Sequence, residues 1–299
     1  MTPPDRPDRL ARLGRSLVQH GPANDRVYLM KLDRADLPGI VGDMERLGRE
    51  RGYGKLFARV PGEAAEAFAA RGFVREARVP GLWRGRDAGC FMAKYRDPGR
   101  ARPRDPERLA EVLRLADAKR RSGALPILPP PGAAAKVEPL RPDHADALAG
   151  LYASVFATYP FPIHDPAWLR RAMGEGTAFF GLFRQGRLAA AASAEVDAHW
   201  RCAEMTDFAT APELRGQGAA GRLLARMERE VARDGVLTAY TIARAASPGM
   251  NIVFARAGYR LGGTLPNNTQ IAGRLESMNV WHKTLPAPET RRGTARDGK

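Results

Sequence analysis

The sequence predicts an α+β protein of two domains, in which a mixed central sheet is flanked by helices. Three observations support this fold class. The chain has 299 residues, whereas a domain usually holds about 100–200. A proline-rich segment near the middle separates two parts of similar size. Short apolar runs typical of strands alternate with helical patterns in both parts, and a hydrophobic fraction of 44% is enough for packed cores.

The domain boundaries follow from changes in composition. Residues 1–23 are polar and arginine-rich and are interpreted as a leader, and residues 24–120 are expected to form the smaller, N-terminal α/β domain. Prolines exclude a helix interior at 121–136, which therefore reads as an extended linker. Residues 137–285 form the second domain, and the basic tail 286–299 is expected to be disordered.

Each expected element rests on apolar periodicity and turn residues. In the N-terminal domain, strands are expected at 27–32, 55–60, 73–79 and 90–95, and helices at 36–51, 63–71 and 106–120. In the second domain, strands are expected at 137–140, 178–183, 188–196, 201–210, 237–243, 259–263 and 278–283. Its helices are expected at 143–156, after Asp165, from Gly218 onward and at 250–257.

A short internal repeat links the two domains. The segment FAARGF at 68–73 parallels FARAGY at 254–259, and both lie between two expected strands. The N-terminal domain is therefore interpreted as a degenerate copy of the second domain, with a chance match over six residues as the alternative.

Charge and composition exclude several classes of protein. The 48 basic residues exceed the 33 acidic ones and give a net charge of +15, which raises nucleic-acid binding as a hypothesis. Only seven of the 48 are lysines and the arginines are scattered, which favours a GC-rich coding sequence over a binding surface. No run reaches the roughly 18 apolar residues of a membrane span, and no apolar secretory region follows Met1. A cytoplasmic protein that binds neither membrane nor nucleic acid is expected.

Cysteine and histidine offer no metal site. The two cysteines, Cys90 and Cys202, cannot build a disulfide framework or a four-ligand centre. The histidines His164, His199 and His282 have no metal-binding spacing, so no metal is expected. Cys202 is interpreted as a buried strand residue rather than a nucleophile.

The segment TAPELRGQGAAG at 210–221 carries the strongest chemical signal. An expected strand ends there, and glycines open an amphipathic helix. A helix N-terminus has unpaired N–H groups and the positive end of the dipole, so it suits a pyrophosphate. Glycine lets the backbone approach phosphate oxygens closely. The segment is neither a Rossmann fingerprint nor a P-loop, and a bare glycine-rich helix start is the alternative interpretation.

The context of this loop resembles the GNAT superfamily of acyl-CoA-dependent acetyltransferases. Arg215-x-x-Gly218-x-Ala220 follows a strand and precedes a helix, a strand and the segment 254–259. The resemblance covers about 137–285 and implies the GNAT fold there, with acetyl-CoA as co-substrate. It implies that the amides of 217–220 hold the pyrophosphate and that the strand at 208–210 pairs with the pantetheine arm. The implied cofactor-binding residues are Phe208, Ala209, Thr210, Arg215, Gly216, Gln217, Gly218, Ala219, Ala220 and Asn251.

A narrower resemblance spans nearly the whole chain. The segments SPGMN (247–251), GGTL (262–265), ESMNVW (276–281) and AEMTDFAT (203–210) are similar to those of the β-lysine N-acetyltransferase family. YPFP at 159–162, NNT at 267–269 and three segments of the first half, YGKLFA, EARVP and FMAKY, agree as well. The family implies acetylation of β-lysine to Nε-acetyl-β-lysine, a compatible solute, by direct attack of the amine on acetyl-CoA.

The reaction needs a base. An alkylammonium with a pKa near 10.4 must lose a proton before attack, which at pH 7 costs roughly 4.6 kcal/mol. By comparison with the superfamily, Glu204 falls where many members place a general base, and Asp207 is the second candidate. Simple alternation puts the two on opposite faces unless a bulge intervenes, and a structural ion pair is the alternative for both. Phe254 occupies the position of the tyrosine that many members have as acid, so no acid is assigned.

The substrate would carry two ammonium groups and a carboxylate, and it therefore needs acidic and amide acceptors plus one cation or N–H pair. The candidates are Asp207, Asn267, Asn268, Glu276 and Asn279. For Asn267 and Asn268, ordinary turn chemistry after Pro266 is the alternative. The loop at 159–162 is expected to cap the substrate side or to pack on the core.

The N-terminal domain lacks a matching glycine loop, so a structural or substrate-shaping role without a second cofactor is expected. Another amine as acceptor (a polyamine, lysine or a protein amine) and a non-catalytic acyl-CoA-binding module remain alternatives. The sequence leaves a homodimer open.

Overall fold

The computed structural model describes residues 8–122, 136–157, 159, 161–271 and 273–286. Most of the linker at 121–136, the start of the leader at 1–23 and nearly all of the tail at 286–299 lie outside the described residues. Within those ranges the chain forms one thirteen-stranded mixed sheet with seven α-helices. None of the described helices is both long and apolar enough to cross a membrane.

The elements have the following bounds. The strands are β1 (Arg9–Leu13), β2 (Ser16–Gly21), β3 (Arg26–Lys31), β4 (Lys55–Pro61), β5 (Val74–Trp83), β6 (Asp87–Tyr95), β7 (Lys136–Pro139), β8 (Thr177–Arg184), β9 (Arg187–Asp197), β10 (Cys202–Thr210), β11 (Thr238–Arg244), β12 (Arg260–Ile271) and β13 (Arg274–Thr284). The helices are α1 (Gly39–Arg51), α2 (Ala65–Ala69), α3 (Pro106–Arg121), α4 (Ala145–Val155), α5 (Pro166–Gly174), α6 (Ala219–Arg233) and α7 (Pro248–Arg256).

The two halves of the sheet have the same strand order. From the centre outward, the C-terminal half runs β12-β13-β11-β10-β9-β8-β7 and the N-terminal half runs β5-β6-β4-β3-β2-β1. In each half, one parallel pair, β10 with β11 or β3 with β4, lies among antiparallel neighbours. Helices α6 and α1 connect these parallel pairs, and α7 and α2 follow them. The N-terminal half therefore lacks only a counterpart of β7 and of the helices α4 and α5.

The six-residue repeat lies at equivalent places in the two halves. Phe68 and Phe254 lie in the last turn of α2 and α7, and their rings pack edge-on against Phe73 and Tyr259, with centroids 5.2 and 5.0 Å apart. A left-handed glycine, Gly72 or Gly258, follows each helix, and the amide of the next aromatic residue donates to the carbonyl of the phenylalanine at 3.1 and 3.0 Å. The repeated sequence thus encodes one helix-ending motif, which favours duplication but does not establish it.

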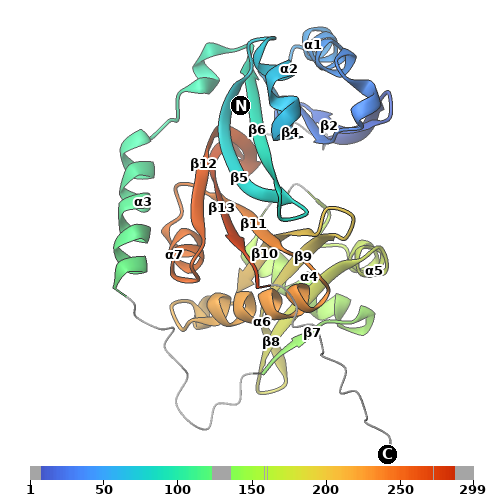
Figure 1. The fold of residues 1–299 in the computed structure, drawn as a ribbon. Coiled ribbons are helices and arrows are strands. Elements are labelled where there is room, and N and C mark those ends of the chain that lie inside the picture. The colour runs from blue at the N-terminus through green and yellow to red at the C-terminus, as the bar shows by residue number, and fades with distance from the viewer. Residues whose placement is uncertain (1–7, 123–135, 158, 160, 272, 287–299) are drawn as a thin grey trace, which may run out of the picture.

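A pair of glycines joins the halves into one sheet. Strands β5 and β12 meet where Gly263 pairs with Ala77. A Cβ at Gly262 would lie 2.7 Å from the carbonyl oxygen of Arg78, and one at Gly263 would lie closer still to that of Glu76. Only glycine permits this approach of two backbones. Figure 1 shows β5 and β12 side by side between the upper and lower parts of the molecule.

Four apolar clusters hold the helices on the sheet. Helices α6 and α7 cover one face of the C-terminal half, and α4 and α5 cover part of the other. Helices α1 and α2 cover one face of the N-terminal half. The remaining faces of both halves share a cluster that includes Phe57, Phe91 and Tyr240. The two halves therefore pack on each other through a shared core.

Three expectations need correction. The leader at 1–23 contains β1 and β2, because Ser16-Leu17-Val18 alternates and the Asp36 carboxylate accepts the amides of Arg15 and Ser16 at 2.9 and 2.7 Å. The strands expected at 259–263 and 278–283 are longer, and Pro266 lies inside β12 rather than in a turn. Helix α3, assigned to the N-terminal domain, buries Ala116 against α7 of the C-terminal half, and Figure 1 shows it running alongside that half.

Candidate active site

The loop before α6 presents unpaired backbone donors. Gly216 and Gly218 both have φ of +78°, a conformation that costs glycine little. Among the described residues, the amides of Gly218, Ala219 and Ala220 have no intramolecular acceptor, whereas the Gln217 amide donates to the carbonyl of Leu214 at 3.3 Å. The segment expected to hold the pyrophosphate thus offers three of its four amides at the positive end of a fifteen-residue helix.

Beside this loop the two parallel strands separate. Strands β10 and β11 pair only from Cys202–Glu204 to Thr238–Tyr240, and each continues beyond that point without pairing to the other. The edge of β10 at 208–210 that faces β11 is therefore open to another extended chain, as the resemblance implies for pantetheine. Arg215 lies at the open end, where its Nε contacts the carbonyl of Thr210 at 3.4 Å.

Asn251 is a correction to the cofactor-binding set. Its side chain is fully buried, and its Nδ2 donates to the carbonyls of Arg244 and Ser247 at 2.9 and 2.6 Å. Its Oδ1 accepts from Asn279 and Trp281 at 2.9 and 2.8 Å. With every polar atom of its side chain satisfied inside the protein, Asn251 fixes α7 to β13 instead of facing a cofactor.

Glu204 lies where β10 and β11 begin to separate. Its carboxylate accepts a hydrogen bond of 2.9 Å from the Tyr240 hydroxyl. The guanidinium of Arg59, on β4 of the other half, donates to the same hydroxyl and to the carbonyl of Met30. Burial raises the pKa of Glu204, while Arg59 and Tyr240 oppose that shift by stabilising the charged form.

A bulge brings Asp207 to the same face as Glu204. The β9–β10 register shifts between Thr206 and Ala209, and Asp207 has φ of +54°. Its carboxylate accepts from Ser193 at 2.5 Å and from the Tyr159 hydroxyl. The bulge overrides the simple alternation that would separate the two carboxylates. Burial raises the pKa of Asp207 despite these hydrogen bonds.

A third carboxylate, Glu195, is the cross-strand partner of Glu204. Burial and then the negative charges of Glu204 and Asp207 raise its pKa. Two like charges on neighbouring strand positions disfavour each other's ionisation, so the two glutamates titrate as a pair.

These groups form one charge cluster on strands from both halves. Glu204, Asp207 and Arg59 are half-buried and Glu195 is exposed, and the charge of Arg59 favours the ionised forms of Glu195 and Glu204. Arg59 also lies over the rings of Trp83 and Tyr240, at 5.8 and 5.6 Å, and its Nε has no partner among the described residues. The charge cluster thus combines three carboxylates with one cation.

The other substrate candidates lie elsewhere. Asn267 donates to the carbonyls of Arg100 and Arg102 at 3.0 and 2.8 Å, and the Asn268 carbonyl accepts from Arg26 at 2.5 Å. Asn267 therefore fastens β12 to the N-terminal half with its side chain instead of facing a substrate. Asn268 does so with its backbone carbonyl, and its buried Oδ1 has no partner among the described residues.

Glu276 and Asn279 are also tied into the protein. Glu276 pairs with Arg244 and Arg274 at 3.1 and 2.7 Å, and Asn279 accepts from Thr264 at 2.7 Å. Both side chains are buried. Of the five substrate candidates, only Asp207 belongs to the charge cluster that contains Glu204.

Sequence reasoning did not select Glu195, Arg59 and Tyr240. For Glu195 a signal was present, because Ser193 and Glu195 are the polar, alternating members of an otherwise alanine-rich strand. Arg59 lay in the half that carries no cofactor loop, and only the folded sheet brings it to Tyr240.

Cys202 and Phe254 are both buried in the core. Cys202 is buried and burial raises its thiol pKa to about 12, as expected for a core residue rather than a nucleophile. Phe254 is buried against Phe208 and Tyr259. Within the described ranges, no group of histidine, cysteine and acidic side chains is arranged to hold a metal ion.

Comparison with known proteins agrees with this geometry. The sequence model of the acetyltransferase (GNAT) family matches residues 146–259. A beta-lysine N(6)-acetyltransferase of Methanococcus maripaludis is 33% identical over 92% of this chain and 98% of its own length. The N-acetyltransferase YodP of Bacillus subtilis is 29% identical over 90% of this chain and 96% of its own. A beta-lysine N(6)-acetyltransferase of Methanosarcina mazei is 37% identical over 47% of this chain and 52% of its own.

The fold, the open strand edge and the α6 loop therefore define an acetyl-CoA-dependent N-acetyltransferase of the GNAT superfamily. Within that superfamily, the chain belongs to the β-lysine N-acetyltransferase family.

Proposed function

We propose that this enzyme transfers an acetyl group from acetyl-CoA to the side-chain amine of β-lysine, forming the compatible solute Nε-acetyl-β-lysine. The relatives from Methanococcus maripaludis and Methanosarcina mazei support this substrate. The observation that carries the proposal is the composition of the charge cluster, in which the carboxylates of Glu195, Glu204 and Asp207 accompany a single cation, Arg59. A diamino acid has the complementary charges, two ammonium groups and one carboxylate.

Glu204 is the proposed general base. The substrate ammonium must lose its proton, at a cost of roughly 4.6 kcal/mol at pH 7. A carboxylate whose pKa is raised by burial accepts that proton more readily than an exposed one. Glu195 shares the proton with Glu204 across the strand pair. When the amine gives its proton to Glu204, the Glu195–Glu204 pair thus becomes less negative by one charge.

Asp207 is proposed to bind the second ammonium group. The hydroxyls of Ser193 and Tyr159 hold its carboxylate in place. An oriented, half-buried carboxylate gives a strong, charge-assisted hydrogen bond to an ammonium. The sequence makes Asp207 both the second candidate base and a candidate for substrate binding, and this proposal assigns it to binding.

The proposed cofactor site consists of the free amides at the start of α6 and the open edge of β10. Acetyl-CoA supplies the acetyl group as an activated thioester when it is bound. The amides of Gly218, Ala219 and Ala220 are proposed to bind its pyrophosphate. The amine is proposed to attack the thioester directly, because the nearby thiol of Cys202 is buried with a raised pKa and the hydroxyl of Ser193 is bonded to Asp207.

A binding experiment tests the cofactor site. Gly218 has φ of +78°, so Gly218→Val strains the loop and places a side chain among the amides. Isothermal titration should show acetyl-CoA binding to the native protein and at least tenfold weaker binding to Gly218→Val. The matched control is Gly39→Ala at the start of α1, where a Cβ meets nothing within 4 Å. Equal affinities in all three proteins would refute the site.

A turnover assay tests the substrate. Initial rates with acetyl-CoA are compared for β-lysine, α-lysine, ornithine and spermidine. A kcat/KM for β-lysine at least tenfold above the others is expected. Comparable values for all four would refute the β-lysine assignment while leaving the acetyltransferase class intact.

Spermidine is the second candidate substrate, since the three carboxylates of the charge cluster also suit a polyamine. Arg59 distinguishes the two candidates, because a polyamine has no carboxylate to offset its charge. Arg59→Met should lower kcat/KM for β-lysine by more than tenfold and lower that for spermidine much less. The reverse ranking would favour the polyamine.

A further inference from the structure

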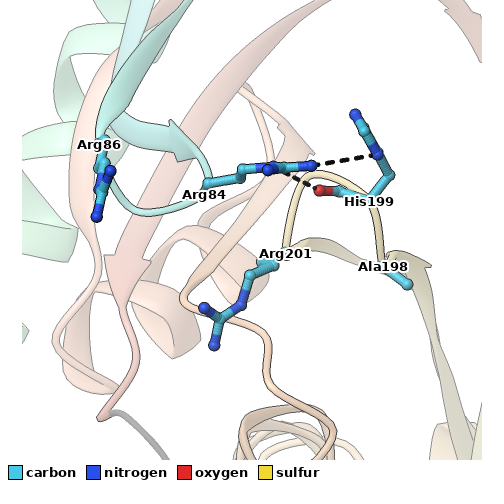
Figure 2. Close-up of a pocket in the computed structure, with 5 residues that line it drawn as sticks. All are labelled: Arg84, Arg86, Ala198, His199 and Arg201. Carbon is cyan, nitrogen blue, oxygen red and sulfur yellow. Dashed lines mark hydrogen bonds between the residues drawn. The ribbon is translucent and has the colours of Figure 1, made fainter.

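A basic cavity lies where the two halves touch, and its lining includes none of the residues of the charge cluster around Glu204. It has a volume of about 390 Å³ and is lined by Arg84, Arg86, Ala198, His199 and Arg201. The first two arginines come from the β5–β6 hairpin and the other residues from the β9–β10 loop, as Figure 2 shows. Within the described part of the chain, no carboxylate lines it.

The cavity walls are held in place by contacts between the halves. The Arg84 amide donates to the carbonyl of Trp200 at 2.7 Å, and its Nε donates to that of His199 at 3.0 Å. The indoles of Trp83 and Trp200 pack with centroids 5.1 Å apart. The fold therefore fixes the backbone that carries Arg84 next to His199, while the side chains of Arg84, Arg86 and Arg201 are exposed.

The backbone also presents two of these arginines. Arg84 and Arg201 each have φ of +53°, a conformation that costs a non-glycine residue free energy and needs support from its surroundings. The Nε of Arg201 donates to the carbonyl of Gly235 at 2.8 Å. The Arg86 amide donates to the carbonyl of Trp83 at 3.0 Å, and its guanidinium makes no hydrogen bond or ion pair within the described residues. Guanidinium donors thus remain available to a ligand (Figure 2).

A second cavity of about 790 Å³ shares Arg84 and His199 with the first. It opens at the carboxyl ends of the parallel strands β3 and β4, where Lys31 and Pro61 end these strands. Four more cations, Arg12, Arg15, Lys31 and Arg34, and a single carboxylate, Asp33, line it. Together the two cavities contain seven lysine and arginine side chains and one acidic residue.

The second cavity lies at a place in the fold where ligands commonly bind. In open sheets with parallel strands, ligands bind outside the carboxyl ends of those strands. In the C-terminal half, that end of β10 leads to the proposed cofactor amides. The second cavity lies at the equivalent end of β3, but on the side facing the other half.

We propose that these adjoining cavities bind a small anion that carries two or more phosphate groups. Like charges gathered around a concave surface repel one another and raise the local concentration of anions. Arginine forks bind phosphate oxygens in pairs, which suits a ligand with several phosphates. The cations are confined to concave walls built by four chain segments, which fits a compact ligand better than an extended nucleic acid.

Isothermal titration of pyrophosphate into the full-length protein tests the proposal. The protein is first saturated with coenzyme A, so that phosphate-binding amides at α6 do not contribute. One pyrophosphate site is expected, and the variant Arg86→Ala/Arg201→Ala should bind at least tenfold more weakly. The matched control is Arg120→Ala/Arg121→Ala on the surface of α3, which should retain the native affinity.

Further arms identify the source of the phosphates and guard against misfolding. Tighter binding of ADP than of pyrophosphate supports the proposal with a nucleotide as ligand, and the reverse supports it with a free polyphosphate. If the double variant unfolds at a lower temperature, Arg86→Ala alone replaces it, because that side chain supports no described contact. No binding to the CoA-saturated protein, or equal affinity in the variants, overturns the proposal. So does RNA binding that needs Arg86 and Arg201 when pyrophosphate does not bind.

Discussion

The two halves of this protein share a strand order but differ at the turn between their parallel strands. In the C-terminal half, the turn from β10 to α6 contains Gly216 and Gly218 in left-handed conformations and leaves amides free. In the N-terminal half, the corresponding turn runs from β3 to α1 and contains Asp33, Asp36 and Pro38. The backbone amides of this turn are therefore open to phosphate in the C-terminal half and closed in the N-terminal half.

Three side chains close the N-terminal turn. Asp33 caps a short 3-10 helix by accepting the Ala35 amide at 2.9 Å. The Asp36 carboxylate accepts from the amides of Arg15 and Ser16, so a negative charge lies where a phosphate would approach. Pro38 at the N-cap of α1 has no N–H to donate. Strand order thus specifies where a site can lie, and a few turn residues decide whether it binds.

The largest expected difference between the halves concerns their buried glutamates. Glu204→Gln should lower kcat by about 10²–10⁴, the usual contribution of a general base, with little change in acetyl-CoA affinity. Steady-state kinetics measure both quantities. A variant that retains more than half of the native kcat would contradict the role of Glu204.

The matched change in the N-terminal half should act on stability. Glu76 accepts two hydrogen bonds of 3.0 Å from Lys55, whose buried ammonium has its pKa lowered to about 8 by loss of solvation. Glu76→Gln leaves that cation without its counter-ion, which should cost about 3–5 kcal/mol in the free energy of unfolding. Urea denaturation measures the cost. Unchanged stability would show that the N-terminal half does not depend on this pair.

The junction between the halves should be the next most sensitive place. Gly263→Ala drives a Cβ into the backbone of β5, so a loss of about 1–3 kcal/mol is expected. Gly249→Ala in α7 is the control, since a Cβ there meets nothing within 4 Å. Thermal unfolding of the two variants compares them. Equal thermal unfolding midpoints for the two variants would mean that the contact of β5 with β12 at Gly263 does not hold the halves together.

The smallest expected effect is a pH dependence from Glu195. Its folded-state pKa is raised above the usual value for glutamate, so the folded protein binds the proton more tightly than the unfolded chain. Stability from this group is therefore present at low pH and is lost as pH rises from about 4.5 to the raised pKa.

Glu195→Gln removes this dependence. Relative to the native protein, the variant should gain about 1 kcal/mol between pH 5 and pH 8, a modest value because water reaches the side chain. Denaturation at the two pH values measures the gain. A constant difference between the proteins would contradict the proton sharing with Glu204.

Much of the fold could be predicted from the sequence because apolar alternation and turn residues report directly on strands. The order of elements in the C-terminal half and the glycine-rich start of α6 were both predicted. The strands β1 and β2 were missed, since their polar and basic residues resemble those of a leader. Their pairing depends on Asp36, which lies more than 15 residues away.

The site was harder to predict because its residues come together only through the fold. Glu204 and Asp207 were found, but their shared face depends on a bulge at Asp207 that alternation does not reveal. Arg59 lies far from both in the sequence. Asn251, Asn267 and Asn279 were assigned to binding because they occur in family-like segments, yet the structure uses their amides to join elements.

The backbone junction at Gly262 and Gly263 has a consequence for engineering. Because β5 and β12 are each completed by the other, cutting the chain between the halves would leave two unprotected strand edges that invite self-association. A truncated catalytic half would also lose Arg59. The two halves are therefore indivisible, and shortening this enzyme would require redesigning a strand edge as well as the active site.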